Sequence, residues 1–101
     1  MIKSSSENLT TWVTRALEGN RDAMENLLRA IRPDIYKLCL RFVMLPQDAE
    51  DATQDILVKV SVRLIQFKHN SHFKTWVFRI ATNQLLDITH ITFLLIILAM
   101  I

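Results

Sequence analysis

Turn-forming residues are scarce in this chain, whose 101 residues include one glycine and two prolines. A β-sandwich or β-barrel needs many tight turns, so this composition favours helices over sheets. The single cysteine, Cys39, excludes an intramolecular disulfide, and its apolar neighbours indicate a small buried hydrophobic residue. The sequence also lacks a Gly-rich phosphate loop and a nucleophile paired with a base. We therefore expect no enzymatic activity and no cofactor.

Metal binding is not expected either, because His69 and His72 have suitable spacing but no evident third ligand. Half of the residues are apolar, which is enough for one core in a single domain of this length. A net charge of +2 permits nucleic-acid binding without requiring it. The polar start of the chain, residues 1–11, cannot be a signal peptide, and we expect a cytoplasmic protein.

Apolar residues recur with helical spacing along most of the chain, which predicts an all-α fold, a compact bundle of about four helices. The expected helices cover residues 9–18, 21–43, 48–67 and about 72–87. Gly19 is placed to end the first helix, Asn20 to cap the second and Asp48 to cap the third. Pro33 predicts a kink or a short break. Phe73 and Trp76 fall on the core side of the fourth helix.

The end of the chain is unusually apolar, with Thr92 as the single polar residue from Ile91 to Ile101. A bilayer-spanning helix needs about 20 apolar residues, and extending this stretch backward takes in His90 and Asp87, so we do not expect a membrane span. The alternatives are an extra C-terminal helix folded on the core, self-association of two copies, and a non-natural end. We divide the chain into an N-terminal tail (1–8), a helical domain (9–87) and an apolar tail (88–101).

Charge is distributed unevenly along the second half of the sequence. Residues 48–55 include four acidic residues and no basic one, whereas five basic residues and one acidic residue follow from position 56 onward. Two ordinary solvated faces would explain this pattern. The functional alternative is a protein partner at the acidic edge and a nucleic-acid backbone at the basic edge.

Two stretches carry a specific resemblance to a known family. Residues 48–56 read Asp-Ala-Glu-Asp-Ala-Thr-Gln-Asp-Ile, and residues 73–87 read Phe-Lys-Thr-Trp-Val-Phe-Arg-Ile-Ala-Thr-Asn-Gln-Leu-Leu-Asp. Both resemble motifs of extracytoplasmic-function sigma factors, in the matching order and spacing. Residues 22–28 resemble the start of a further helix of that family, so that the likeness covers about residues 9–87, the family's region 2.

The resemblance implies a non-enzymatic module for transcription initiation that binds core RNA polymerase and recognises and melts the promoter −10 element as single-stranded DNA. It implies contacts to the clamp helices of the polymerase β′ subunit from Asp51, Gln54, Asp55, Val58, Lys59 and Val62. The linker after the third helix resembles the loop that captures a flipped base, here Lys68, His69, Asn70 and Ser71. The fourth helix resembles the one that meets the −10 strand, through Lys74, Thr75, Arg79, Thr82 and Asn83.

The sequence departs from the family after Asp87. The family usually continues with Arg and Lys residues and then a helix-turn-helix domain that reads the −35 element, whereas here the apolar tail follows. One alternative is therefore a truncated or frameshifted sigma-like module that binds polymerase or an anti-sigma factor without productive DNA binding. Another is a small helical protein that associates with a membrane through its tail.

Overall fold

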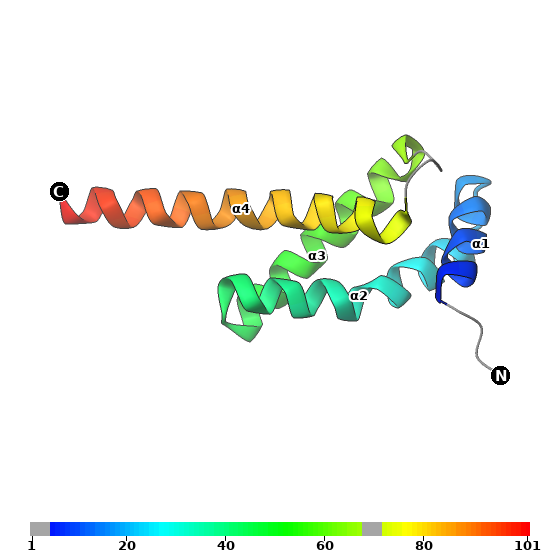
Figure 1. The fold of residues 1–101 in the computed structure, drawn as a ribbon, viewed down its shortest axis with the longest axis horizontal. Helices are drawn as coiled ribbons and strands as arrows, with labels where there is room; N and C mark the ends of the chain where they lie inside the picture. The colour runs from blue at the N-terminus through cyan, green and yellow to red at the C-terminus, as the bar shows by residue number, and fades with distance from the viewer. Residues whose placement is uncertain (1–4, 68–71) are drawn as a thin grey trace.

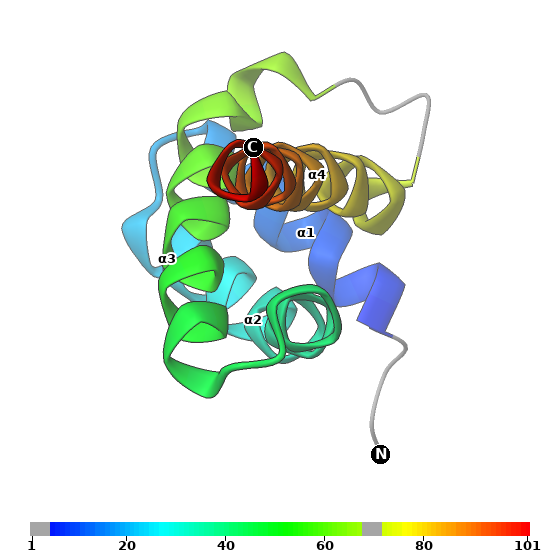
Figure 2. The same cartoon turned by 90° about the vertical axis from the view of Figure 1, so that its left-hand side faces the viewer.

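The computed structural model describes residues 5–67 and 72–101, and every element in them is helical, which confirms the all-α prediction. The elements are α1 (Ser5–Leu17), α2 (Arg21–Val43), α3 (Pro46–Arg63), the short 3-10 helix η1 (Leu64–Gln66) and α4 (Phe73–Met100). Figure 1 shows α2 and α3 crossing beneath the first half of α4, while α1 covers one end of the bundle. Viewed along α4, the other three helices group around one side of it (Figure 2).

The connection between α1 and α2 has the cap residues that the sequence predicted. Gly19 has φ +96°, the left-handed conformation that glycine adopts without a steric penalty. The next residue, Asn20, is the N-cap of α2, and its side-chain oxygen accepts a hydrogen bond of 3.0 Å from the backbone N–H of Ala23. These two residues fix the direction in which α2 leaves α1.

Pro33 lies inside α2 without dividing it into two helices. The ribbon of α2 bends in its middle third (Figure 1), where the ring of a proline removes one backbone hydrogen bond and crowds the preceding turn. Ile31 and Ile35, on either side of Pro33, are both buried. The predicted kink, rather than a break, therefore keeps both parts of α2 on the same core.

The predicted start of α3 was wrong by two residues. Asp48 does not cap this helix, because α3 begins at Pro46 with Leu45 as an N-cap that makes no side-chain hydrogen bond. Proline suits the first position of a helix, since its missing N–H would have no partner there. Asp48 instead lies in the first turn, where its charge favours the helix dipole. Just before, the exposed Met44 ends α2 in the left-handed conformation with φ 65°.

The apolar tail does not fold back on the core as a fifth helix. It continues α4 without interruption to Met100, because residues 73–101 contain no glycine or proline that would turn the chain. Every residue from 93 to 101 is exposed, and we call this segment the α4 extension. Among the described residues, α4 is the helix long and apolar enough to cross a membrane, a criterion that core helices of soluble proteins also meet.

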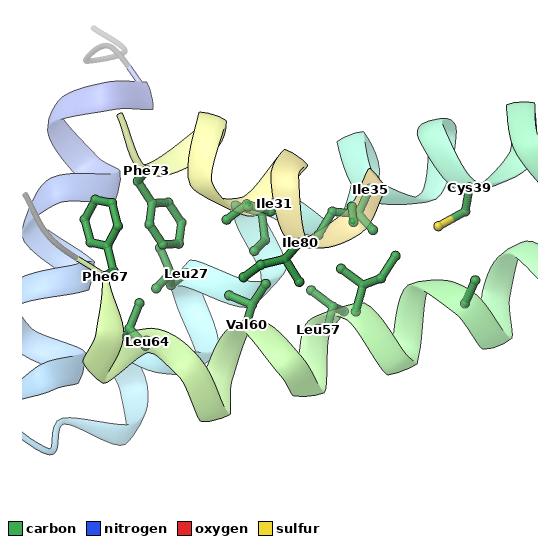
Figure 3. Close-up of a cluster of buried hydrophobic side chains, with 14 of the residues drawn as sticks. Leu27, Ile31, Ile35, Cys39, Leu57, Val60, Leu64, Phe67, Phe73 and Ile80 are labelled. Atoms are coloured by element: carbon green, nitrogen blue, oxygen red, sulfur yellow. The ribbon is translucent and has the colours of Figure 1, made fainter. Parts of the chain in front are cut away.

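The core lies between α2, α3 and the first half of α4, with α1 closing one end (Figure 3). Its fully buried side chains include Leu27, Ile35, Ile56 and Leu85, each of which stabilises the fold by about 1.5–3 kcal/mol relative to an exposed side chain. Cys39 is buried as predicted. Burial raises the pKa of the Cys39 thiol, and this effect exceeds the opposing one of the Thr53 hydroxyl.

Candidate functional site

Five of the six residues predicted to contact the polymerase form one exposed face of α3. Asp51, Gln54, Asp55, Val58 and Val62 are all exposed, and their spacing of three and four residues places them on one side of the helix. Val58 is 58% exposed and Val62 is 70% exposed, so the face carries a bare apolar half beside a polar half. We call these five residues the α3 outer face.

The acidic residues at the start of α3 divide into two groups. Glu50 accepts hydrogen bonds of 3.2 Å from the guanidinium of Arg32 at both carboxylate oxygens, and this ion pair joins α3 to α2. Asp51 accepts a long hydrogen bond of 3.4 Å from Gln47, one turn earlier on the same helix. Glu50 therefore holds two helices together, whereas the carboxylates of Asp51 and Asp55 face solvent.

Lys59, the sixth predicted polymerase contact, lies apart from the α3 outer face. Its ammonium donates a hydrogen bond to the side-chain oxygen of Gln84 on α4, and the lysine is half-buried between the two helices. A cation in this position has an internal partner already. The structure thus assigns Lys59 a contact between α3 and α4, which the sequence motif alone could not indicate.

The two ends of the predicted base-capturing linker are fixed by aromatic packing. Phe67 and Phe73 are buried, and their rings meet edge to face with centroids 5.4 Å apart. Trp76 completes the cluster, 5.3 Å from Phe67 and 5.8 Å from Phe73, in agreement with its predicted place on the core side. Residues Lys68, His69, Asn70 and Ser71 lie outside the described residues.

The predicted DNA-contacting residues of α4 lie in two adjacent rows. Thr75, Arg79 and Asn83 are exposed and spaced by four, so they form an outward row. Lys74 and Thr82 belong to a second row that faces α2, where the ammonium of Lys74 lies 3.8 Å from a carboxylate oxygen of Asp34. Both partners of this ion pair are about half exposed, so it is weak.

Between this second row and α2 lies an open pocket of about 350 Å³, which we call the α2–α4 groove. It is lined by Asp34, Lys37, Leu38, Arg41, Phe78 and Thr82. Lys37, Arg41 and Phe78 were not among the predicted site residues. The signal was present in the sequence, because Lys37 and Arg41 are one turn apart on α2, but their nearness to α4 depends on tertiary packing. The groove combines cations with an aromatic ring that is 38% exposed.

A second pocket of about 490 Å³ lies where the α4 extension passes the junction of α2 and α3. Its apolar lining comes from all three helices: Phe42, Val43, Ala52, Ile88, Phe93 and Ile96. The carboxylate residues Asp48, Asp51 and Asp55 also line it. We call this pocket the acidic hollow, and two of its three acidic residues belong to the α3 outer face.

Comparison with known proteins identifies the family of the chain. Residues 27–91 match the family described as Sigma-70 region 2. The ECF RNA polymerase sigma factor SigW of Bacillus subtilis is 32% identical over 75 residues, which is 74% of this chain and 40% of that protein. The RNA polymerase sigma-H factor of Pseudomonas aeruginosa is 35% identical over 71 residues, which is 70% of this chain and 37% of that protein. The chain thus spans well under half the length of these relatives.

Proposed function

The chain belongs to the sigma-70 region 2 family, and we propose that it acts without enzymatic activity in transcription initiation, in the cytoplasm, by binding core RNA polymerase and promoter DNA. The functional unit we propose is residues 9–87. The observation that carries the proposal is the presence of two separate surfaces on one small fold. The α3 outer face suits a helical protein partner, whereas the α2–α4 groove and the outward row of α4 suit a nucleic-acid strand.

The α3 outer face is the proposed site for the clamp helices of the polymerase β′ subunit. Val58 and Val62 present an apolar strip that can pack against one ridge of a coiled coil, since neither is covered in the free chain. Asp51, Gln54 and Asp55 continue this strip with groups that accept hydrogen bonds from basic side chains. Lys59 enters the proposal as a positioning residue, because its bond to Gln84 holds α3 against α4.

Retention of purified chain on immobilised core polymerase tests this surface. We expect Gln54→Ala and Asp51→Ala each to weaken retention by about fivefold to tenfold, the effect of losing roughly 1 kcal/mol at an interface. Glu18→Ala, an exposed acidic position outside the proposed face, is the matched control and should bind as the unaltered chain does. Equal retention of all four proteins, or no retention of any, would contradict the proposed interface.

The second proposed surface binds the −10 strand in single-stranded form. Lys37, Arg41 and Lys74 supply cations along the α2–α4 groove, and Phe78 offers a ring on which a base can stack. Thr75, Arg79 and Asn83 extend the surface along α4, where polar groups can reach phosphates and base edges. From the family resemblance, we add the linker residues Lys68, His69, Asn70 and Ser71 as the proposed pocket for a flipped base.

Asp34 allows a direct test of this surface, because a DNA phosphate must compete with the Asp34 carboxylate for the ammonium of Lys74. We expect Asp34→Asn to strengthen binding of a −10-like single strand and Lys74→Ala to weaken it. Lys74→Ala should also lower the slope of log affinity against log salt by about 0.7, the value for one lost phosphate contact on a single strand. Arg29→Ala removes an equal charge from a surface position paired with Glu25 and is the control.

One feature favours a second function, that of a protein-interaction module without productive DNA binding. Residues 88–101 contain no lysine or arginine, so this stretch of α4 offers neither of these side chains to a DNA backbone. Such a module would bind polymerase or an anti-sigma factor through the α3 outer face. Undetectable affinity for single-stranded DNA at low salt, together with retained polymerase binding, would select this function over the first.

A further inference from the structure

The α4 extension is apolar on every side and exposed on every side. Phe93 is 60% exposed, Leu95 61% and Leu98 67%, and the remaining residues of the segment are also more than a third exposed. Nine such residues in a row make a patch larger than the few hundred Å² that monomeric soluble proteins usually leave in water. A helix that is hydrophobic all round requires an environment that covers it.

The described residues of the chain leave the extension uncovered. The extension is the straight continuation of α4, and it projects past the α2–α3 junction (Figure 1). The acidic hollow lies at its base, with Phe93 and Ile96 on one wall and Phe42 and Val43 on another. This hollow is open and has an apolar lining, so apolar side chains from outside can enter it.

We propose that two copies of this chain associate through their α4 extensions in antiparallel orientation, and that the outer end of each extension lies over the acidic hollow of the other copy. The extension carries no charge that would select a charged partner, since residues 88–101 contain no acidic residue, lysine or arginine. Another copy of the same segment presents a matching apolar surface of equal length. A two-fold pair also buries the same patch on both subunits, as closed homodimers do.

The charges at the base of the extension determine the antiparallel orientation. Asp87 and the three aspartates of the hollow lie at that end. In a parallel pair the two acidic clusters would face each other. In an antiparallel pair that overlaps residues 93–101, the two Phe93 positions lie roughly 12 Å apart along the helix axis and the two Asp87 positions roughly 30 Å apart, at 1.5 Å per residue. Both separations exceed the Debye length of about 8 Å at physiological salt, so the acidic clusters repel each other less than they would in the parallel pair.

The same charges favour a protein occupant over a lipid bilayer. Segments that enter a membrane surface are usually flanked by lysine and arginine, which anionic headgroups attract. Here aspartates flank the base of the extension, and the nearest preceding basic residue is Arg79, more than two turns away from Asp87. An anionic membrane would therefore repel the part of the chain nearest to its surface.

Pairing would have a consequence for activity, which rests on the proposed function. Asp51 and Asp55 line the hollow and also belong to the α3 outer face. An extension from a second copy would cover this end of the face, so the pair and the polymerase complex compete for the same residues. Self-association would then hold the chain in a form that polymerase cannot bind.

Molar mass measured by light scattering over a concentration series tests the pairing directly. We expect twice the mass of one 11.8 kDa chain at high concentration, with dissociation on dilution. Leu95→Asp places a charge in the middle of the contact and should raise the dissociation constant at least about a hundredfold, as expected for burying an unpaired charge. A monomer at every concentration, or an open series of larger species, would overturn the proposal.

Two substitutions of similar size at one position test the orientation. In the antiparallel pair, Met100 lies near the partner's acidic hollow, so Met100→Lys should weaken pairing about tenfold less than Met100→Glu does. In a parallel pair this position would meet its own copy, and the two variants would weaken pairing equally. Equal effects would therefore overturn the antiparallel arrangement, and circular dichroism of each variant checks that α4 remains helical.

Vesicles and polymerase separate the remaining outcomes. If the monomeric chain floats with vesicles of anionic phospholipid and the Leu95→Asp variant does not, the extension binds a membrane. That result would overturn the pairing. With core polymerase, Leu95→Asp should be retained at least as well as the unaltered chain, and the advantage should grow with chain concentration. If neither protein binds polymerase, the proposed function fails while the mass measurements still decide the pairing.

Discussion

The first half of α4 and the α4 extension have opposite environments. In the first half Phe73, Val77, Ile80 and Leu85 are buried, whereas in the α4 extension every side chain is exposed. The two segments belong to one uninterrupted helix, so the difference cannot come from local backbone structure. It comes from their neighbours, since α2 and α3 pack against the first half and their junction lies below its end (Figure 1).

This comparison shows that the hydrophobicity of a segment indicates that it must be buried, but not which part of the chain or which partner buries it. The first half has an amphipathic pattern, with Thr75, Arg79 and Asn83 on the side away from the core. The extension has no polar side, because all of its residues are apolar. An amphipathic helix can bury its apolar side within its own domain. A helix that is exposed and apolar all round is buried by another molecule.

Matched truncations in the two halves should give the largest contrast in stability. Leu85 is fully buried, and Leu85→Ala should lower the free energy of unfolding by about 2–5 kcal/mol through lost burial and a residual cavity. Leu95 is 61% exposed, and Leu95→Ala should change it by less than about 0.5 kcal/mol. Urea denaturation followed by circular dichroism measures both values.

That measurement must be made at a concentration where the chain is monomeric, because pairing would add its own stability to the extension. An unchanged transition for Leu85→Ala would mean that the first half of α4 is not part of the cooperative core. A loss above 2 kcal/mol for Leu95→Ala in the monomer would mean that the extension contacts the core, against the exposed position seen here.

Sequence periodicity predicted where the helices lie when a polar side accompanies an apolar one, although α1 begins at Ser5, within the predicted tail of residues 1–8. The bounds of α2 were predicted without error, because Asn20 and the end of the apolar pattern mark both ends. The start of α3 was missed because Asp48 and Pro46 are both good residues for a helix start, and only the connection from α2 decides between them. The course of the apolar tail could not be predicted, because a helix without a polar side does not indicate which of its sides faces the core.

Most residues of the candidate site could be proposed from the sequence, but the side-chain contacts between them could not. Motif likeness identified the α3 outer face and the outward row of α4, whose residues are exposed as a binding surface requires. It could not show that Lys59 bonds to Gln84 or that Asp34 lies beside Lys74, because these contacts join residues far apart in the sequence. Lys37 and Arg41 were missed for the same reason, as they join the site only through the crossing of α2 and α4.

Two lysines that connect the first half of α4 to its neighbouring helices should differ in their contribution to stability. Lys59 donates to Gln84 from a half-buried position, and Lys59→Met should lower the free energy of unfolding by about 1 kcal/mol. Lys74 pairs with Asp34 in an exposed position, so Lys74→Met should cost less than about 0.5 kcal/mol. Urea midpoints in 0.15 M salt compare the two, and equal losses would show that the contact of Lys59 with α4 adds nothing beyond a surface ion pair.

The smallest expected effect on stability concerns Cys39. This residue lies in the packed core, so its titration should not depend on the α4 extension. Burial raises the pKa of its thiol above the ordinary value of 9.0, so the folded chain retains its proton where the unfolded chain loses it. Because the unfolded state then binds fewer protons, the free energy of unfolding should fall as the pH rises above 9.0. This fall should be absent in Cys39→Ala, which is the control for all other titrating groups.

The alkylation rate of the Cys39 thiol can be used to compare the two halves of α4, since only the thiolate reacts with alkylating reagents. At neutral pH the native chain should react far more slowly than the urea-unfolded chain, at a rate set by transient opening of the core. Leu85→Ala weakens the packing of α4 on that core and should speed the reaction, whereas Leu95→Ala should leave the rate unchanged. A faster reaction in Leu95→Ala would show that the extension stabilises the core after all, and the distinction between the halves of α4 would then lie in exposure alone.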